Sequence, residues 1–146
     1  MIGVACPNRS SCYAVGLFES RSPGGAAKPL IERWNGASWS VMSYAIPPGI
    51  AYQTVLVGAT CRSDRDCYAV GDRYPEYQQN KTLIERWNGN SWSVVPSPSP
   101  SMIGSFSLLA GVACPTVKNC QAVGVGYPDK PLAVHWTGSS WRIVPA

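Results

Sequence analysis

The sequence has little charge and no long apolar run. Charged residues make up 14% of the 146 positions, and the twelve Lys and Arg are scattered singly, for a formal net charge of +4. Cations spread in this way do not indicate a nucleic-acid partner or an anionic membrane. No stretch of 18 apolar residues occurs, so the sequence predicts no membrane-spanning helix.

Residue types that catalyse reactions or bind metals are also scarce. There is one histidine, His135, and there are only eight Asp and Glu. Phosphate-binding loops, EF-hand loops, dinucleotide fingerprints and the G-x-S-x-G motif do not occur. We therefore expect no cofactor, no metal site and no catalytic residues.

Glycine and proline, in contrast, are plentiful, with 14 and 13 residues. They divide the chain into short segments rich in apolar and β-branched residues, without a helical periodicity. The length suffices for one compact domain with a core. This composition predicts an all-β fold.

Three repeated units account for most of the chain. Each contains two cysteines with a short spacing and, further on, a pair of tryptophans. The paired segments are GVACPNRSSCYAVG (3–16) with PLIERWNGASWSVM (29–42), VGATCRSDRDCYAVG (57–71) with TLIERWNGNSWSVV (82–95), and GVACPTVKNCQAVG (111–124) with PLAVHWTGSSWRIV (131–144). The period of about 53 residues is typical of repeat architectures, and we place the units at about 1–46, 47–98 and 99–146.

Each unit predicts a four-stranded antiparallel meander. Two strands surround the cysteine pair, and two more surround an Asn-Gly turn, because Asn and Gly both tolerate the positive φ of tight hairpins. With a loop over residues 35–38, Trp34 faces Trp39 across the hairpin. The tryptophans with this predicted structural role are Trp34, Trp39, Trp87, Trp92, Trp136 and Trp141.

Several of these motifs resemble tandem units of extracellular proteins from actinobacteria and related bacteria. The resemblance is carried by Cys6 and Cys12, YAVG at 13–16 and 68–71, IERWNG at 31–36 and 84–89, and PSPSP at 96–100. It covers almost the whole chain and implies β-propeller blades, which usually come in larger numbers. The third unit departs from the pattern, with Val134 and His135 in place of Glu-Arg and Thr137 in place of Asn.

The meander repeat itself also predicts propeller blades, and a β-trefoil, which has three units of four strands, is the alternative fold. Three blades do not close a ring, because propellers typically have about four to eight. We therefore expect either a piece of a larger repeat protein or a homodimer in which two copies close one propeller. A well-folded monomer would favour the trefoil.

The six cysteines are predicted to form one local disulfide per unit: Cys6–Cys12, Cys61–Cys67 and Cys114–Cys120. The repeat selects this pairing among the fifteen that six cysteines allow. Zinc binding is the alternative, but zinc sites favour closer cysteine spacings and histidine. Disulfides indicate a secreted or cell-surface protein, although the sequence shows no signal peptide at Met1.

The repeated pairs Glu32-Arg33 and Glu85-Arg86 could each be an acid beside a cation. Adjacent strand residues point to opposite faces, so we interpret these carboxylates as structural, each bonded to a neighbouring blade or a turn N–H. His135 has no second histidine or free thiol to work with and is interpreted as a scaffold residue. The tryptophans could stack on sugars, but their fixed repeat positions favour packing.

Function is expected at the end of each unit where the repeats differ. In a meander, the loops between second and third strands lie opposite the cysteine and Asn-Gly turns. These loops, 17–28, 72–81 and 125–130, differ in length and chemistry, and rigid scaffolds carry recognition residues on such loops. The candidate ligand-binding residues are Arg73, Tyr74, Glu76, Tyr77, Gln78, Tyr127 and Asp129.

The sequence therefore predicts a non-catalytic extracellular recognition or scaffold module that binds a protein or a carbohydrate. A lectin-like carbohydrate-binding protein is the first alternative. A secreted glycan-active hydrolase is the weaker alternative, because a glycosidase needs two carboxylates on opposite sides of the scissile bond. The carboxylates considered for such a role are Glu19, Asp72 and Glu76, which lie in or beside the variable loops.

Overall fold

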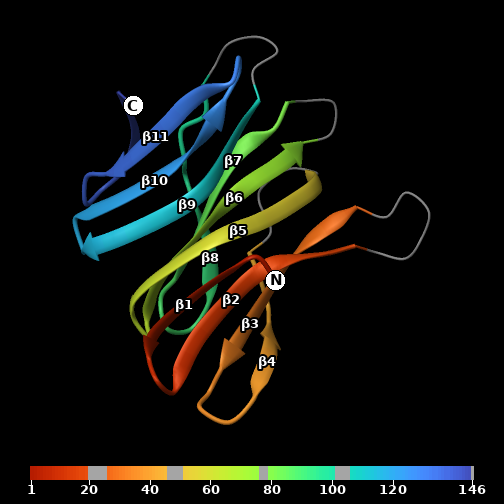
Figure 1. Cartoon of the computed structure of the whole chain (residues 1–146), viewed down its shortest axis with the longest axis vertical. Coiled ribbons are helices and arrows are strands. Elements are labelled where there is room, and N and C mark those ends of the chain that lie inside the picture. Colours follow the sequence, from red (N-terminus) through yellow and green to blue (C-terminus); the bar gives the residue numbers. More distant parts are fainter. Residues whose placement is uncertain (20–25, 46–50, 76–78, 101–105, 146) are drawn as a thin grey trace.

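The computed structural model (Figure 1) describes residues 1–19, 26–45, 51–75, 79–100 and 106–145. These residues form three four-stranded antiparallel sheets and no helix, so also no helix long and apolar enough to cross a membrane. The strands are β1 (Gly3–Asn8), β2 (Ser11–Glu19), β3 (Ala27–Trp34), β4 (Trp39–Met42), β5 (Ala51–Ser63), β6 (Asp66–Pro75), β7 (Lys81–Trp87), β8 (Trp92–Val95), β9 (Ser107–Thr116), β10 (Asn119–Gly126), β11 (Lys130–Trp136) and β12 (Trp141–Val144). The predicted all-β class and the three four-stranded repeats are confirmed.

Each sheet is a meander of four consecutive strands. The first sheet has the order β1-β2-β3-β4, the second β5-β6-β7-β8 and the third β9-β10-β11-β12, and neighbouring strands are antiparallel. The sheets follow one another along the molecule in chain order, with β5 between β1 and β9 (Figure 1). In every sheet, the turn between the first and second strands and the turn between the third and fourth strands therefore lie at one end. The loop between the second and third strands lies at the other end.

The cysteine pairs lie at the first turn of each sheet, as predicted. Disulfides join Cys6 to Cys12, Cys61 to Cys67, and Cys114 to Cys120, with Cα–Cα distances of 4.0 Å in all three. The chain contains no free cysteine among the described residues. Each bridge closes the hairpin between the first two strands of its sheet and fixes the end that the repeats share.

The tryptophans pair across the second hairpin of each sheet. Trp34 lies opposite Trp39, Trp87 opposite Trp92, and Trp136 opposite Trp141, with ring centroids 5.8 Å apart in each pair. Such cross-strand aromatic pairs each contribute roughly 0.2 to 1 kcal/mol to sheet stability.

The Asn-Gly turn works differently from the expectation that both residues adopt positive φ. Gly36 has φ +97°, whereas Asn35 is not among the positive-φ residues. The Asn35 side-chain oxygen instead accepts the N–H groups of Ala37 and Ser38, both at 2.9 Å. In the third unit Thr137 replaces the asparagine, and its hydroxyl takes part in the same turn through Ser140.

Each sheet has two different faces, which we name by their aromatic residues. The tryptophan face carries the tryptophan pair, and the tyrosine face carries the residue after the second cysteine: Tyr13, Tyr68 or, in the third sheet, Gln121. The tyrosine face of the first sheet packs on the tryptophan face of the second, and Tyr13, Val15 and Ile31 share one buried cluster with Leu56 and Leu83.

The second and third sheets pack by the same arrangement. Tyr68, Val70 and Ile84 of the second sheet lie in one buried cluster with Leu109 and Val134 of the third. The second sheet is thus buried on both faces, because its strands carry apolar residues at odd and even positions. The core of the molecule consists of these two layers between sheets.

Candidate functional site

The predicted ligand-binding residues fall into two groups on different sheets. Arg73 and Tyr74 lie at the end of β6, whereas Tyr127 and Asp129 lie in the turn between β10 and β11. Tyr74 and Tyr127 are exposed, with 42% and 48% of their surface accessible. The other three predicted residues, Glu76, Tyr77 and Gln78, lie outside the described residues.

The third-sheet group is anchored within its own loop. The N–H of Tyr127 donates to the carbonyl of Phe106 at 2.9 Å, and the two rings meet edge to face with centroids 6.3 Å apart. Asp129 has φ +51°, a left-handed backbone that Asp tolerates better than most residues. This tight turn shows two side chains to solvent but encloses no space between them.

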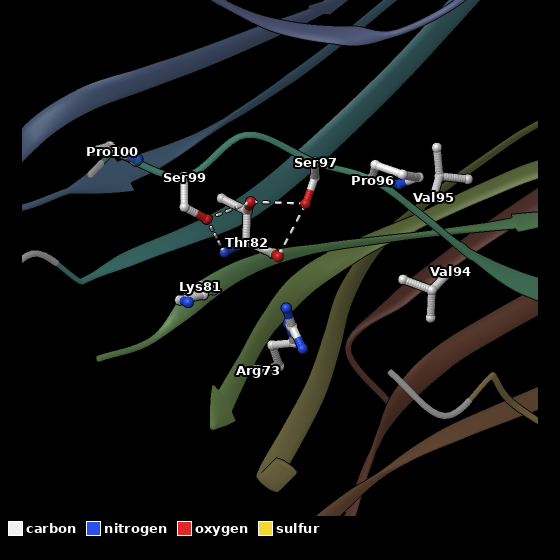
Figure 2. Close-up of a pocket in the computed structure, with 9 residues that line it drawn as sticks. All are labelled: Arg73, Lys81, Thr82, Val94, Val95, Pro96, Ser97, Ser99 and Pro100. Carbon is white, nitrogen blue, oxygen red and sulfur yellow. Dashed lines mark hydrogen bonds between the residues drawn. The ribbon is translucent and has the colours of Figure 1, made fainter. Parts of the chain in front are cut away.

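A pocket of about 530 Å³ lies at the variable end of the second sheet (Figure 2). It contains one predicted residue, Arg73, and not Tyr74, Tyr127 or Asp129. Its lining residues are Arg73, Lys81, Thr82, Val94, Val95, Pro96, Ser97, Ser99 and Pro100. The walls therefore come from β6, β7, β8 and the segment that leaves the second sheet.

Thr82 fixes the segment 96–100 over β7. Its N–H donates to the Ser99 hydroxyl at 3.1 Å, and its own hydroxyl lies 2.9 Å from that of Ser97 and 3.0 Å from that of Ser99. The Ser97 hydroxyl donates in turn to the Thr82 carbonyl at 3.0 Å. Figure 2 shows this closed set of hydrogen bonds, which is why the serine- and proline-rich segment forms a wall of the pocket.

The same strand position is proline in the other two units, at Pro29 and Pro131. Proline has neither an N–H nor a hydroxyl, so neither of those units can hold an exit segment in this way. The pocket wall thus depends on a residue that only the second unit carries.

Two cations border the pocket. Arg73 and Lys81 are direct partners across β6 and β7, so their side chains leave the sheet on the same face. Two cationic side chains on one face of the sheet favour the binding of an anionic group beside them. Val94 lies on the same face of the sheet as these cations, and Val95 lines the pocket from the opposite face.

Asp72 is the nearest carboxyl in sequence to these cations. The Asn80 side-chain NH₂ donates to it at 2.7 Å, and the Asn80 carbonyl accepts the N–H of Ser107 at 2.9 Å. Burial raises the pKa of Asp72 above its ordinary value, and the hydrogen bond from Asn80 opposes part of that rise. These bonds give Asp72 a role in tying the loop before β7 to the third sheet.

The repeated glutamates differ sharply in environment. Glu85 is fully buried on the tryptophan face of the second sheet and accepts the N–H of Ala45 at 3.2 Å. Burial raises the pKa of the Glu85 carboxyl to about 7, against the smaller opposing effect of that hydrogen bond. Glu32, at the same position in the first sheet, is half-buried. The interpretation of the carboxylate as a structural group bonded to a neighbouring unit holds for Glu85.

The third unit replaces this glutamate with Val134, which is fully buried. The residue that corresponds to Ala45 in the second unit's exit segment is Pro98, which has no N–H to donate. The third unit thus lacks the carboxyl acceptor, and the segment before it lacks the N–H donor.

His135 lies on the tyrosine face of the third sheet, where its Nδ1 is 3.0 Å from the side-chain nitrogen of Gln121. Among the residues that the structure describes, no group of three or more His, Cys, Asp and Glu could hold a metal ion. The expectation of no catalytic site stays a prediction.

The residues predicted to bind a ligand did not include Lys81, Thr82 or the 96–100 segment. The available signal was the threonine in place of proline, next to a stretch with alternating serines. Comparisons with known proteins found no matching protein-family model and no matching curated protein. The resemblance to bacterial extracellular repeats therefore stays a prediction as well.

Proposed function

We propose that the protein is a non-catalytic recognition module of the cell exterior or cell surface, which binds its ligand at the variable end of the second sheet. The observation that carries the proposal is the pocket bordered by Arg73 and Lys81, built where the second unit departs from the other two. The opposite end is the same in all three sheets, with one disulfide each. A constant end and a built, variable end are the arrangement of a binding scaffold.

The chemistry of the pocket favours a ligand with a carboxylate next to an apolar portion. Arginine and lysine bind carboxylates through charge-assisted hydrogen bonds, and Val94, Val95 and Pro96 line the pocket with apolar side chains. The hydroxyl of Thr82 is already engaged with Ser97 and Ser99. The cations and the apolar wall would therefore provide the specificity, whether the carboxylate belongs to an acidic peptide or to an acidic sugar.

The experiment is a binding screen of acidic peptides, acidic glycans and neutral glycans against the intact chain. Lys81→Glu should abolish binding of the carboxylate ligands by placing a like charge in the pocket. Lys130→Glu is the matched control, because Lys130 begins β11 as Lys81 begins β7 but does not line this pocket. Equal loss of binding in both variants, or no ligand in any class, would contradict the proposal.

The lectin-like alternative is favoured by one specific observation. Trp39 of the first sheet is 46% exposed beside Trp34, and exposed aromatic rings can pack on sugar faces. Binding of neutral glycans that Trp39→Ala removes and Lys81→Glu leaves intact would select this alternative over the pocket.

We also propose that the three sheets are propeller blades. The proposal is supported by the meander within each sheet, by the contacts of β1 with β5 and of β5 with β9, and by face-to-face packing. Closure through a homodimer stays a prediction, and the solution mass of the purified chain tests it. A stable monomer at high concentration would contradict the homodimer.

A further inference from the structure

Both tryptophan pairs inside the molecule are covered by a tyrosine of the preceding sheet. The Tyr13 ring lies 6.0 Å from that of Trp87 and 6.2 Å from that of Trp92. Tyr68 takes the same place at 6.5 Å from Trp136 and 5.8 Å from Trp141. The same contact, a tyrosine packed on a tryptophan pair, thus occurs at both interfaces between consecutive units.

The tyrosine hydroxyl adds a polar anchor at the first of these contacts. Tyr13 donates to the carbonyl of Asp64 at 2.7 Å, and Trp87 donates to the same carbonyl at 2.9 Å. The guanidinium carbon of Arg33 lies over the Tyr13 ring, 5.8 Å from its centroid. The tyrosine thus contacts an arginine of its own sheet as well as the tryptophans of the next.

Among the described residues, no tyrosine covers the tryptophan face of the first sheet. Trp34 and Trp39 have the same 5.8 Å separation as the covered pairs, yet Trp39 is 46% exposed, whereas its counterparts Trp92 and Trp141 are 6% and 4% exposed. Val4 and Val41 on this face are 60% and 68% exposed, and Glu32 lies between them in the strand register. Large exposed apolar side chains gathered on one sheet face mark an interaction site.

The other open face of the molecule does not match it. On the tyrosine face of the third sheet, Gln121 stands in place of tyrosine, Ala133 in place of isoleucine and His135 in place of arginine. The third sheet of a second copy would therefore bring an amide, rather than an aromatic ring, to Trp34 and Trp39.

We propose that the tryptophan face of the first sheet binds the tyrosine face of a further repeat unit of this kind, with a tyrosine at the position of Tyr13, and not the third sheet of a second copy. The incoming ring sits on Trp34 and Trp39. Glu32 accepts a backbone N–H from the segment that leaves the incoming unit, as Glu85 does from Ala45. This proposal concerns a second surface and is independent of the pocket.

The chain itself can supply a defined probe. The probe carries Gln121→Tyr, Ala133→Ile and His135→Arg, which give its third sheet the residues found on the covering faces, and Trp39→Gln, which disables its own receiving face. A control probe carries Trp39→Gln alone. Each is titrated into the unmodified chain, and association is measured by analytical ultracentrifugation.

We expect the probe to form a one-to-one complex at least about tenfold tighter than the control probe, since an aromatic contact of this type is worth about a factor of ten in affinity. A receiving chain with Trp39→Gln should not bind the probe. Gln121→Tyr alone, a change at an exposed position, provides a second probe if the triple change impairs folding, which near-ultraviolet circular dichroism reveals.

Three results would overturn the proposal. One is the absence of any complex with either folded probe. Another is equally tight binding of the control probe, which would make the third sheet of a second copy the occupant. The last is a complex that survives Trp39→Gln in the receiving chain, which would place the contact elsewhere.

Discussion

The buried carboxyl of Glu85 predicts an unusual pH dependence of stability. Its pKa is raised to about 7 in the folded chain from 4.5, so the folded state holds the proton more tightly than the unfolded state. The resulting stabilisation is fully present below pH 4.5 and is lost as the pH rises through 7. Between pH 5 and pH 8 the loss amounts to roughly 2 to 3 kcal/mol of unfolding free energy.

The assay is denaturant unfolding at pH 5 and pH 8, followed by tryptophan fluorescence with the disulfides intact. Glu85→Gln places a neutral group of the same shape beside the Ala45 N–H, so at pH 5 its stability should lie within about 1 kcal/mol of the unmodified chain. At pH 8 it should be more stable by about 3 kcal/mol, the extra free energy needed to ionise Glu85 in the folded chain rather than in the unfolded one. Asp72, whose pKa is also raised, contributes equally to both chains and cancels in the comparison.

Glu32→Gln is the matched control, because the same residue at the same repeat position lies on the open face of the first sheet. That change should leave the difference between pH 5 and pH 8 in place. If Glu85→Gln preserved the full pH dependence, or if the unmodified chain were equally stable at both pH values, the assignment of a buried, protonated Glu85 would be refuted.

Three further predictions concern the scaffold. Gly71→Ala should lower the unfolding free energy by at least about 2 kcal/mol, because a new methyl group would overlap a backbone carbonyl of β5, whereas Gly111→Ala, which has open space, should be tolerated; thermal melts compare the two. Thr82→Pro should cost about 1 to 3 kcal/mol by leaving the exit segment without its hydrogen bonds, which urea unfolding measures. Joint Cys6→Ser and Cys12→Ser substitution should cost roughly 2 kcal/mol on the chain-entropy account, measured by urea unfolding, and an unchanged midpoint would argue against a stabilising bridge.

Strand pairing was predictable because the same pattern of residues occurs three times in the sequence. A cysteine pair at constant spacing fixes the first hairpin, and a tryptophan on each side of a four-residue turn fixes the second. The role of Asn35 was not predictable in the same way. Its side chain satisfies two backbone donors, and the frequency of Asn-Gly in hairpins does not distinguish that role from a positive φ.

The sequence of the repeated motif does not predict how deeply its residues are buried. The letters IERWNG occur in both the first and the second unit, yet Glu85 is fully buried and Glu32 is not. The difference arises from the neighbouring sheet, which lies far away in sequence. The pocket could not be predicted from the motifs either. Arg73 was expected at a variable loop, but the wall of the pocket is formed by Thr82 and the proline-rich segment that it holds.

Ala45 and Glu85 meet between the first and second sheets, and Pro98 and Val134 hold the corresponding positions between the second and third. This difference has a consequence for the order of the units along the chain. An amide hydrogen faces a carboxyl in the first case, and the second case offers a pyrrolidine ring and an isopropyl group. A permuted chain, with the first and second units exchanged, would place the carboxyl of Glu32 opposite Pro98, which has no N–H to donate. The units look interchangeable in sequence, but the residues at these positions differ and specify which unit each one follows.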